Sequence, residues 1–142
     1  AFFQRMISRL LWPAAPCQYL ICELLNGKKL TNPLYGRRIV YGGHIISLAR
    51  ALSFNGLGNA FRIAAINGGR HVAPSFAGNT IYAWSEVKEK VALAERAGVG
   101  ALHLRTVATK DQPCAEFPDV GPDGKPHPAV VLDLDYWALM PR

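Results

Sequence analysis

An α+β fold, in which an antiparallel sheet curls around one buried helix, is the architecture that the sequence predicts. Residues 45–54 carry apolar side chains at helical spacing, and most of the later chain alternates as strands do. Turn-forming residues separate the later runs, with no second helical pattern between them. Parallel strands would need long crossover connections, so consecutive strands joined by turns favour antiparallel pairing.

The predicted helix starts after a Gly-Gly break and has one clear apolar face. The i, i+3, i+4 and i+7 spacing is filled by Ile45, Leu48, Ala49 and Leu52. Three further apolar residues widen this face: Ile46, Ala51 and Phe54. Asn-Gly and Gly-Asn pairs within residues 55–59 end the helix, because these residues readily take positive φ. A helix that is apolar on more than one side is expected to be buried and wrapped by the sheet.

Four strands are expected after the helix, and the last three are long. Their ranges are 61–66, 80–91, 99–110 and 129–139. The sequence Asn-Gly-Gly at 67–69 predicts a turn that closes the first strand, and residues 74–79 predict another. A sheet of this kind, curled around a single helix, is the hot-dog arrangement.

The length of 142 residues predicts a single core, which we assign to one domain at 36–142. Residues 1–35 form an N-terminal segment of uncertain structure. Its apolar run carries early arginines, but prolines interrupt it and no signal-peptide cleavage pattern is clear. The run is also too short to cross a bilayer, so no membrane association is expected and a core-facing or dimer-facing role is the default.

Charge and cysteine content narrow the classes of partner. The net charge of +6 suits an anionic partner, and the scattered basic residues fit a phosphate-bearing small ligand. No basic-aromatic module is present, so nucleic acid is not an expected partner. Cys17, Cys22 and Cys114 show no metal-binding spacing, and the histidines form no metal triad. Free thiols in a reducing, cytoplasmic compartment are the preferred interpretation.

Five long runs of the chain resemble one known family. They are RRIVYGGHIISLARALSFNGL, AAINGGRH, PSFAGNTIYAWSEV, LRTVATKDQPC and AVVLDLDYWALMPR. From Gly36 to Arg142 the chain resembles the MaoC-like dehydratases, especially the C-terminal half of the mesaconyl-CoA hydratase (β-methylmalyl-CoA dehydratase) branch. The resemblance implies a hot-dog fold and reversible addition of water to a 2-enoyl coenzyme A thioester. Coenzyme A is then part of the substrate, and no separate cofactor is expected.

The family carries two hot-dog halves in one chain, and this chain has room for one. Hot-dog halves pair so that their sheets join and the ligand lies between them. The resemblance therefore implies a homodimer.

Hydration needs a base, an acid and hydrogen-bond donors at the developing enolate oxygen. Gly42 and Gly43 are candidates for the donors, because the first N–H groups of a helix are unpaired and point toward an anion. A flexible strand-to-helix turn is the alternative interpretation of these glycines. His44 follows in the first helical turn, where the helix dipole favours a neutral imidazole, and is either catalytic or structural.

The acid–base pair of the family is only partly retained. In the mesaconyl-CoA branch an Asn-x-His precedes the Gly turn, and counting back from Gly42 places these positions at Asn26 and Lys28. Asn26 thus joins the predicted catalytic residues, whereas lysine replaces the histidine. His71, which follows a Gly-Gly-Arg sequence, is predicted to be either a ligand contact or merely exposed.

Substrate-binding candidates lie around the same turn. Tyr41 belongs to the YGGH run of the resemblance, and Arg37, Arg38 and Arg70 are candidates for the anionic groups of coenzyme A. Each arginine is alternatively a solvated surface residue. The carboxylates of Asp133 and Asp135 face one way on the last strand, and an exposed polar strand face explains them better than catalysis does.

The leading prediction is an acyl-CoA hydratase or dehydratase. One alternative, favoured by Lys28, is a catalytically impaired hot-dog domain that binds acyl-CoA thioesters or serves as a structural partner. Another is a hot-dog thioesterase, for which Glu23 is the only nearby acid. A histidine or acid within hydrogen-bond reach of the Gly42 and Gly43 N–H groups would discriminate among the three.

Overall fold

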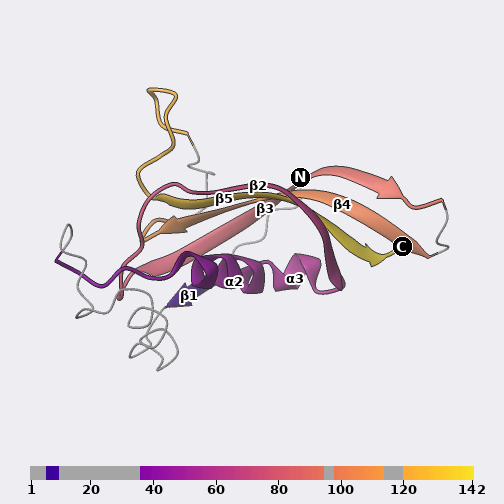
Figure 1. Ribbon diagram of the computed structural model, residues 1–142, viewed down its shortest axis with the longest axis horizontal. Helices are drawn as coiled ribbons and strands as arrows, with labels where there is room; N and C mark the ends of the chain where they lie inside the picture. Colours follow the sequence, from indigo (N-terminus) through magenta and orange to yellow (C-terminus); the bar gives the residue numbers. More distant parts are fainter. Residues whose placement is uncertain (1–5, 10–35, 95–97, 114–119) are drawn as a thin grey trace.

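A five-stranded antiparallel sheet with a helix packed along one face forms the domain (Figure 1). The structure is a computed structural model that describes residues 6–9, 36–94, 98–113 and 120–142. The strand order is β1-β3-β4-β5-β2, so the strands that flank the helix in sequence lie at opposite edges. In the described part of the chain, no helix is long and apolar enough to cross a membrane.

The elements follow in chain order: β1 (Met6–Arg9), α2 (Gly42–Leu52), α3 (Phe54–Leu57), β2 (Arg62–His71), β3 (Thr80–Ala92), β4 (Val99–Lys110) and β5 (Val130–Pro141). The predictions of a helix and of three long strands beyond residue 80 are confirmed. The sequence did not predict β1, which pairs with β3 and so places part of the segment 1–35 in the same sheet.

The prediction of a turn at residues 67–69 is wrong. Strand β2 instead runs through Asn-Gly-Gly to His71 and stays paired with β5 over its length. The pairing register shifts between Ile63 and Ala65 and again between Ile66 and Gly68. Glycine in a strand often marks such an irregularity, because it allows the local bend without reversing the chain.

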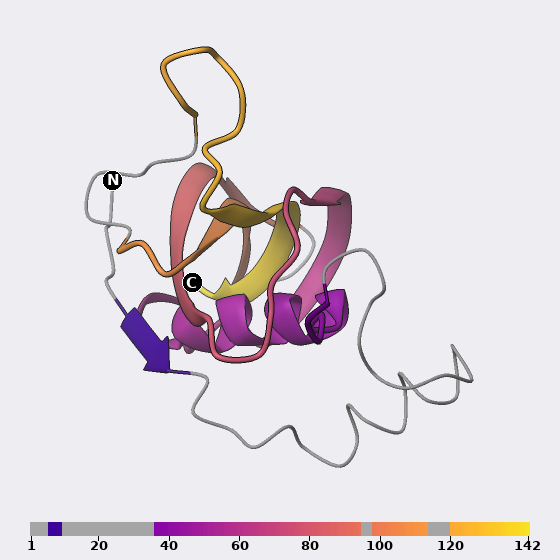
Figure 2. The ribbon, with the colours of Figure 1, turned by 90° about the vertical axis from the view of Figure 1, so that its left-hand side faces the viewer.

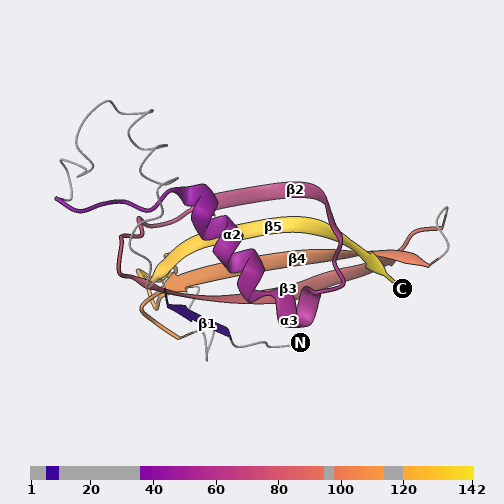
Figure 3. The same cartoon turned by 90° about the horizontal axis from the view of Figure 1, so that it is seen from below.

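The core lies between α2 and the inner face of the sheet, defined here as the face that α2 covers. The helix contributes Ile45, Ala49 and Leu52 to it, as its apolar spacing predicted. The largest contributions from β3, β4 and β5 are Ile81, Leu104, Leu132 and Tyr136, all at most 1 % exposed. Figure 2 shows the sheet curving around the helix, and Figure 3 shows the helix crossing the strands obliquely.

One side of the helix remains open, contrary to the expectation that the sheet wraps it. Ala51 is exposed, and the Phe54 side chain that follows is 65 % exposed. Every residue of β2 is exposed as well. The sheet covers α2 mainly through β3 and β4, and among the described residues β2 adds little to that cover.

Candidate active site

The start of α2 presents unpaired backbone donors. Tyr41 precedes the helix with φ −59° and ψ 133°, and its side chain makes no capping hydrogen bond. The N–H of His44 donates to the carbonyl of Tyr41 at 3.0 Å. Among the described residues, no hydrogen bond occupies the N–H groups of Gly42 and Gly43. These groups and the positive end of the helix dipole therefore suit a developing oxyanion.

The imidazole of His71 lies directly against Gly42. A methyl group at position 42 would lie 2.5 Å from Nε2 of His71 and 2.7 Å from Cε1. Only glycine leaves room for the ring there. His71 ends β2 opposite Leu132, whose side chain is in the inner core, so the His71 side chain is on the helix side of the sheet. The fold thus brings a titratable group to the predicted oxyanion site.

A second aromatic side chain lies over Gly43. A methyl group at position 43 would overlap the ring of Tyr41 and would lie 3.1 Å from the tyrosine hydroxyl oxygen. Tyr41 is 52 % exposed, so its ring covers the glycine from the solvent side. The two donors are therefore flanked by a phenol and an imidazole, each of which needs a glycine beneath it.

The predicted arginines separate into two places. Arg37 lies in the segment that leads into α2, with its guanidinium carbon 4.8 Å from the centre of the Phe76 ring. The carbonyl of Arg38, in the same segment, accepts the N–H of Ala77 at 3.3 Å. Arg70 points to the outer face of the sheet, opposite to α2, and pairs with Asp133 there. The structure therefore does not bring Arg70 to the helix start.

Several predicted residues lie outside the described residues: Asn26, Lys28, Glu23 and the three cysteines. Their roles stay predictions. Within the described ranges, no group of three or more His, Cys, Asp or Glu side chains is arranged to hold a metal ion.

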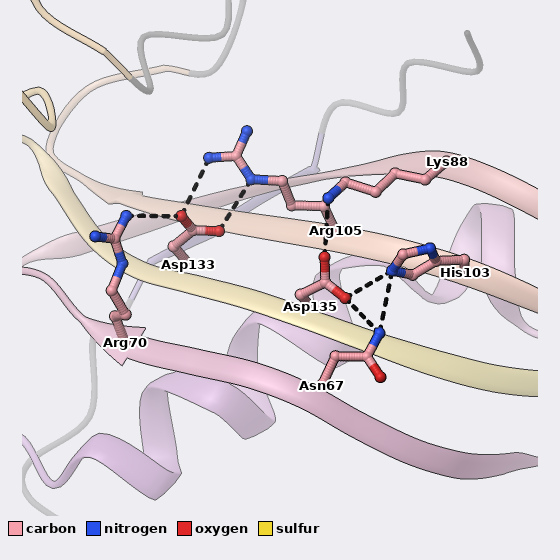
Figure 4. A network of polar contacts seen from close by, with 7 residues as sticks. All are labelled: Asn67, Arg70, Lys88, His103, Arg105, Asp133 and Asp135. Carbon is pink, nitrogen blue, oxygen red and sulfur yellow. Dashed lines mark hydrogen bonds and ion pairs between the residues drawn. The ribbon is translucent and has the colours of Figure 1, made fainter. Parts of the chain in front are cut away.

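The outer face of the sheet carries a separate polar network (Figure 4). Asp135 accepts bonds from Lys88 at 2.9 Å and from Asn67 at 2.8 Å, and it pairs with His103 at 2.6 Å. The His103 ring stacks on Trp137 with centroids 4.7 Å apart. Lys88 and His103 hold the pKa of Asp135 well below its ordinary value. The Asp135 carboxylate therefore forms hydrogen bonds and ion pairs with side chains of the other strands.

Asp133, two residues before Asp135 on β5, is also bound by basic side chains of neighbouring strands. Arg105 donates to it from Nε at 3.0 Å and from a terminal nitrogen at 3.1 Å, and Arg70 adds a bond at 3.2 Å. The Arg105 bonds lower the pKa of Asp133, although partial burial opposes the shift. Both aspartates therefore join strands together on the face away from α2, which supports the structural interpretation of this pair.

Replacing Asp135 by asparagine is expected to flatten the acid side of the stability profile. Because the pKa of Asp135 is lower folded than unfolded, the ionised group stabilises the fold above about pH 4, and this contribution is lost as the pH falls further. Asp135→Asn should cost about 1 kcal/mol at pH 7 and less near pH 2. Urea unfolding at several pH values measures this. Glu89→Gln, which removes an exposed carboxylate from β3, should leave the profile unchanged.

Comparison with known proteins finds relatives with high sequence identity over most of the chain. No protein-family model matches it. The chain is 68% identical over 108 residues to a β-methylmalyl-CoA dehydratase from Chloroflexus aurantiacus, and 58% identical over 112 residues to a mesaconyl-CoA hydratase from Cereibacter sphaeroides. These matches cover 76% and 79% of this chain. The chain spans only about a third of the length of these curated relatives, 31% and 32% respectively.

Solved structures give the same relationship and the fold. A putative MaoC domain dehydratase from Chloroflexus aurantiacus matches with a TM-score of 0.71 and 59% identity, over 87% of this chain and 33% of that one. A conserved hypothetical protein from Mycobacterium tuberculosis, described as a double hot-dog fold, matches with a TM-score of 0.60 and 26% identity, over 97% of this chain and 38% of that one. The chain therefore has the hot-dog fold and is similar, along about three quarters of its length, to one part of the MaoC-like dehydratases of the mesaconyl-CoA hydratase branch.

Proposed function

We propose that this chain catalyses the reversible hydration of a 2-enoyl coenzyme A thioester at the start of α2. The observation that carries the proposal is the imidazole of His71 against Gly42. A base on β2 and unpaired donors on α2 meet at one point, and hydration requires both. Relatives named as a mesaconyl-CoA hydratase and a β-methylmalyl-CoA dehydratase support the reaction class.

The proposed reaction uses His71 as both base and acid. The imidazole takes a proton from water, and the water oxygen forms its bond to C3 of the enoyl group. The C2–C3 π electrons move toward the carbonyl, and the enolate oxygen accepts hydrogen bonds from the N–H groups of Gly42 and Gly43. The imidazolium then returns a proton to C2, which completes the addition of one water. Dehydration follows the same path in reverse.

Residues around the helix start are assigned to substrate binding. Tyr41, over Gly43, would cover the thioester, and its hydroxyl is a further donor. Arg37 and Arg38 lie before the helix and carry charges suited to the phosphates of coenzyme A. His44 keeps its predicted place in the first turn, and Asn26 remains a predicted contributor.

We also propose that two copies of this chain pair through β2, the exposed edge strand, and that the protein is cytoplasmic. An edge strand with unpaired backbone groups and apolar side chains is suited to join another sheet. The double hot-dog description of a structural relative supports a second domain beside this one.

Gly42→Ala is the variant that tests the site with least disturbance elsewhere. The added methyl group must displace His71, so turnover of mesaconyl-CoA and crotonyl-CoA should fall about tenfold or more. Gly68→Ala is the matched control, because a methyl group on this residue of β2 would meet nothing within 4 Å, and it should lose less than about threefold. Loss of enoyl-thioester absorbance reports turnover, and thermal unfolding checks the fold of both variants.

Other outcomes select among the functions. Tight binding of both thioesters without turnover by the unaltered chain would favour the catalytically impaired binding domain. Release of free coenzyme A in place of a hydrated thioester would favour a thioesterase. Equal losses in the two glycine variants would show that contact between His71 and Gly42 does not matter to the reaction.

A further inference from the structure

We infer that Arg50, in the last turn of α2, binds a carboxylate group in a cavity between that helix and β5. The cavity has a volume of about 150 Å³. Its walls include Arg50, Phe54, Leu57, Leu104 and Tyr136. It opens on the side of α2 that the sheet leaves uncovered, away from the polar network of the outer face. This inference rests on the proposed function and concerns which acyl groups the site accepts.

The Arg50 side chain is turned inward and lacks an acceptor. An arginine in the last helical turn usually extends into solvent beside the final carbonyls. Here Nη1 is inaccessible to solvent and has no hydrogen-bond partner among the described residues. The guanidinium carbon lies 5.4 Å from the centre of the Tyr136 ring. The ring stabilises the positive charge but supplies no lone pair in line with Nη1, so a buried, always charged donor remains to be satisfied.

The cavity suits a carboxylate better than a phosphate. Its wall contains one cation and no aspartate or glutamate, with mostly apolar side chains around the charge. A single guanidinium neutralises one negative charge and matches the planar fork of a carboxylate. A phosphate dianion would bring a second charge into this apolar space without a counterion.

Arg50 is also placed to meet the far end of a short dicarboxylic acyl group. Gly43 and Arg50 are seven residues apart, two turns along one helix face, which corresponds to about 10.5 Å. The arginine side chain covers part of this rise, because the side chains of a helix lean toward its N-terminus. A short dicarboxylic acyl group held at the start of α2 would therefore extend along the helix toward the guanidinium.

The carboxylate has two possible sources, and both are consistent with the chemistry of the cavity. One is the second carboxylate of the acyl group, as the name of the mesaconyl-CoA hydratase relative indicates. The other is a carboxylate side chain from the second copy of the chain across β2. These sources predict different responses when the guanidinium is removed.

The test compares dissociation constants for mesaconyl-CoA and crotonyl-CoA in the unaltered chain, in Arg50→Met and in Arg50→Lys. Crotonyl-CoA lacks the second carboxylate. If the acyl group supplies it, Arg50→Met should weaken mesaconyl-CoA binding about 10- to 100-fold while crotonyl-CoA changes less than about twofold. Arg50→Lys should fall between, because it keeps the charge but loses the fork. Continued crotonyl-CoA hydration by Arg50→Met shows that the reaction itself is intact.

A carboxylate from the second copy gives another pattern. Arg50→Met would then weaken both thioesters equally and raise the dissociation constant of the dimer, measured by analytical ultracentrifugation. A third measurement needs no coenzyme A and compares unfolding temperatures in sodium acetate and in sodium chloride at equal ionic strength. Acetate should raise the unfolding temperature of a chain whose Arg50 cavity is unfilled. It should not raise that of Arg50→Met. The inference would be overturned if Arg50→Met matched the unaltered chain in thioester binding, in dimerisation and in its response to acetate. The proposed hydration would then remain untouched.

Discussion

Replacing His71 by glutamine is expected to lower the rate of enoyl-CoA hydration by about 10²- to 10⁴-fold, the usual contribution of a positioned acid–base group. Glutamine keeps hydrogen-bonding capacity at the end of β2 but cannot exchange a proton at neutral pH. His71 is exposed and belongs to no core cluster, so the fold should lose little stability. Steady-state kinetics with crotonyl-CoA and mesaconyl-CoA give kcat and KM separately. The loss should lie mainly in kcat, because proton transfer occurs in the transition state.

Two further histidine variants make this result specific. His127→Gln changes a residue of the 120–129 loop, where the ring accepts the N–H of Ala129, and should leave the rate within about twofold. His44→Gln tests the histidine that the sequence offered as a catalytic candidate beside the glycines, with a structural role as the alternative. A full loss in His44→Gln, together with normal turnover in His71→Gln, would transfer the acid–base role from β2 to the first turn of α2.

The contrast between these two histidines shows what the sequence could reveal about the site. His44 stands next to the glycines in sequence, so a motif points to it. His71 reaches Gly42 only because β2 continues past Asn-Gly-Gly and ends level with the start of α2. A turn at 67–69 would end the strand before His71, and the sequence alone therefore allows two interpretations of this residue, a ligand contact or an exposed side chain. Pairing with β5, a long-range interaction, overrides the local turn preference.

The alternation of side chains along β2 explains why Arg70 lies away from the start of α2. Arg70 and His71 are neighbours in sequence, and successive strand side chains point to opposite faces. Once His71 faces α2, Arg70 must face away from it, where it meets Asp133. The sequence predicted the long strands β3, β4 and β5 well because their apolar alternation is sustained. It did not predict β1, whose four residues gain their structure from pairing with β3.

Strand β2 has the properties of an interface that this chain alone does not complete. Ile63 and Ile66 pair opposite Ala138 and Tyr136, two core residues of the inner face, so both isoleucines lie on the side of α2. They are 37% and 61% exposed, and Phe54, which shares a cavity wall with Ala138 and Tyr136, is 65% exposed. These three residues form the β2 strip. Exposed apolar side chains near an open strand edge are typical of a contact with another sheet.

Lysine at both isoleucine positions of the β2 strip is expected to convert the proposed dimer to monomer. Each ammonium group would be buried without a partner, at a cost of several kcal/mol, and about 1.4 kcal/mol corresponds to a tenfold change in dissociation constant. Ile63→Lys/Ile66→Lys should therefore raise that constant by more than about 100-fold. Light scattering and sedimentation at micromolar concentration measure the change. Because the second copy would cover the open side of α2, hydration should be lost with the dimer.

The control places lysine on an exposed apolar residue outside the strip. Val120 is 55% exposed and forms a bridge with Pro126 within the loop before β5. It lies beside Arg105 and Asp133 on the outer face of the sheet, the face opposite to the β2 strip. Val120→Lys should leave both mass and turnover unchanged. If the unaltered chain is a monomer and still hydrates crotonyl-CoA, one hot-dog domain suffices for the reaction, and the β2 strip must then serve a different partner. If mass and activity fall together only in the β2 variant, the joined sheets are part of the active enzyme.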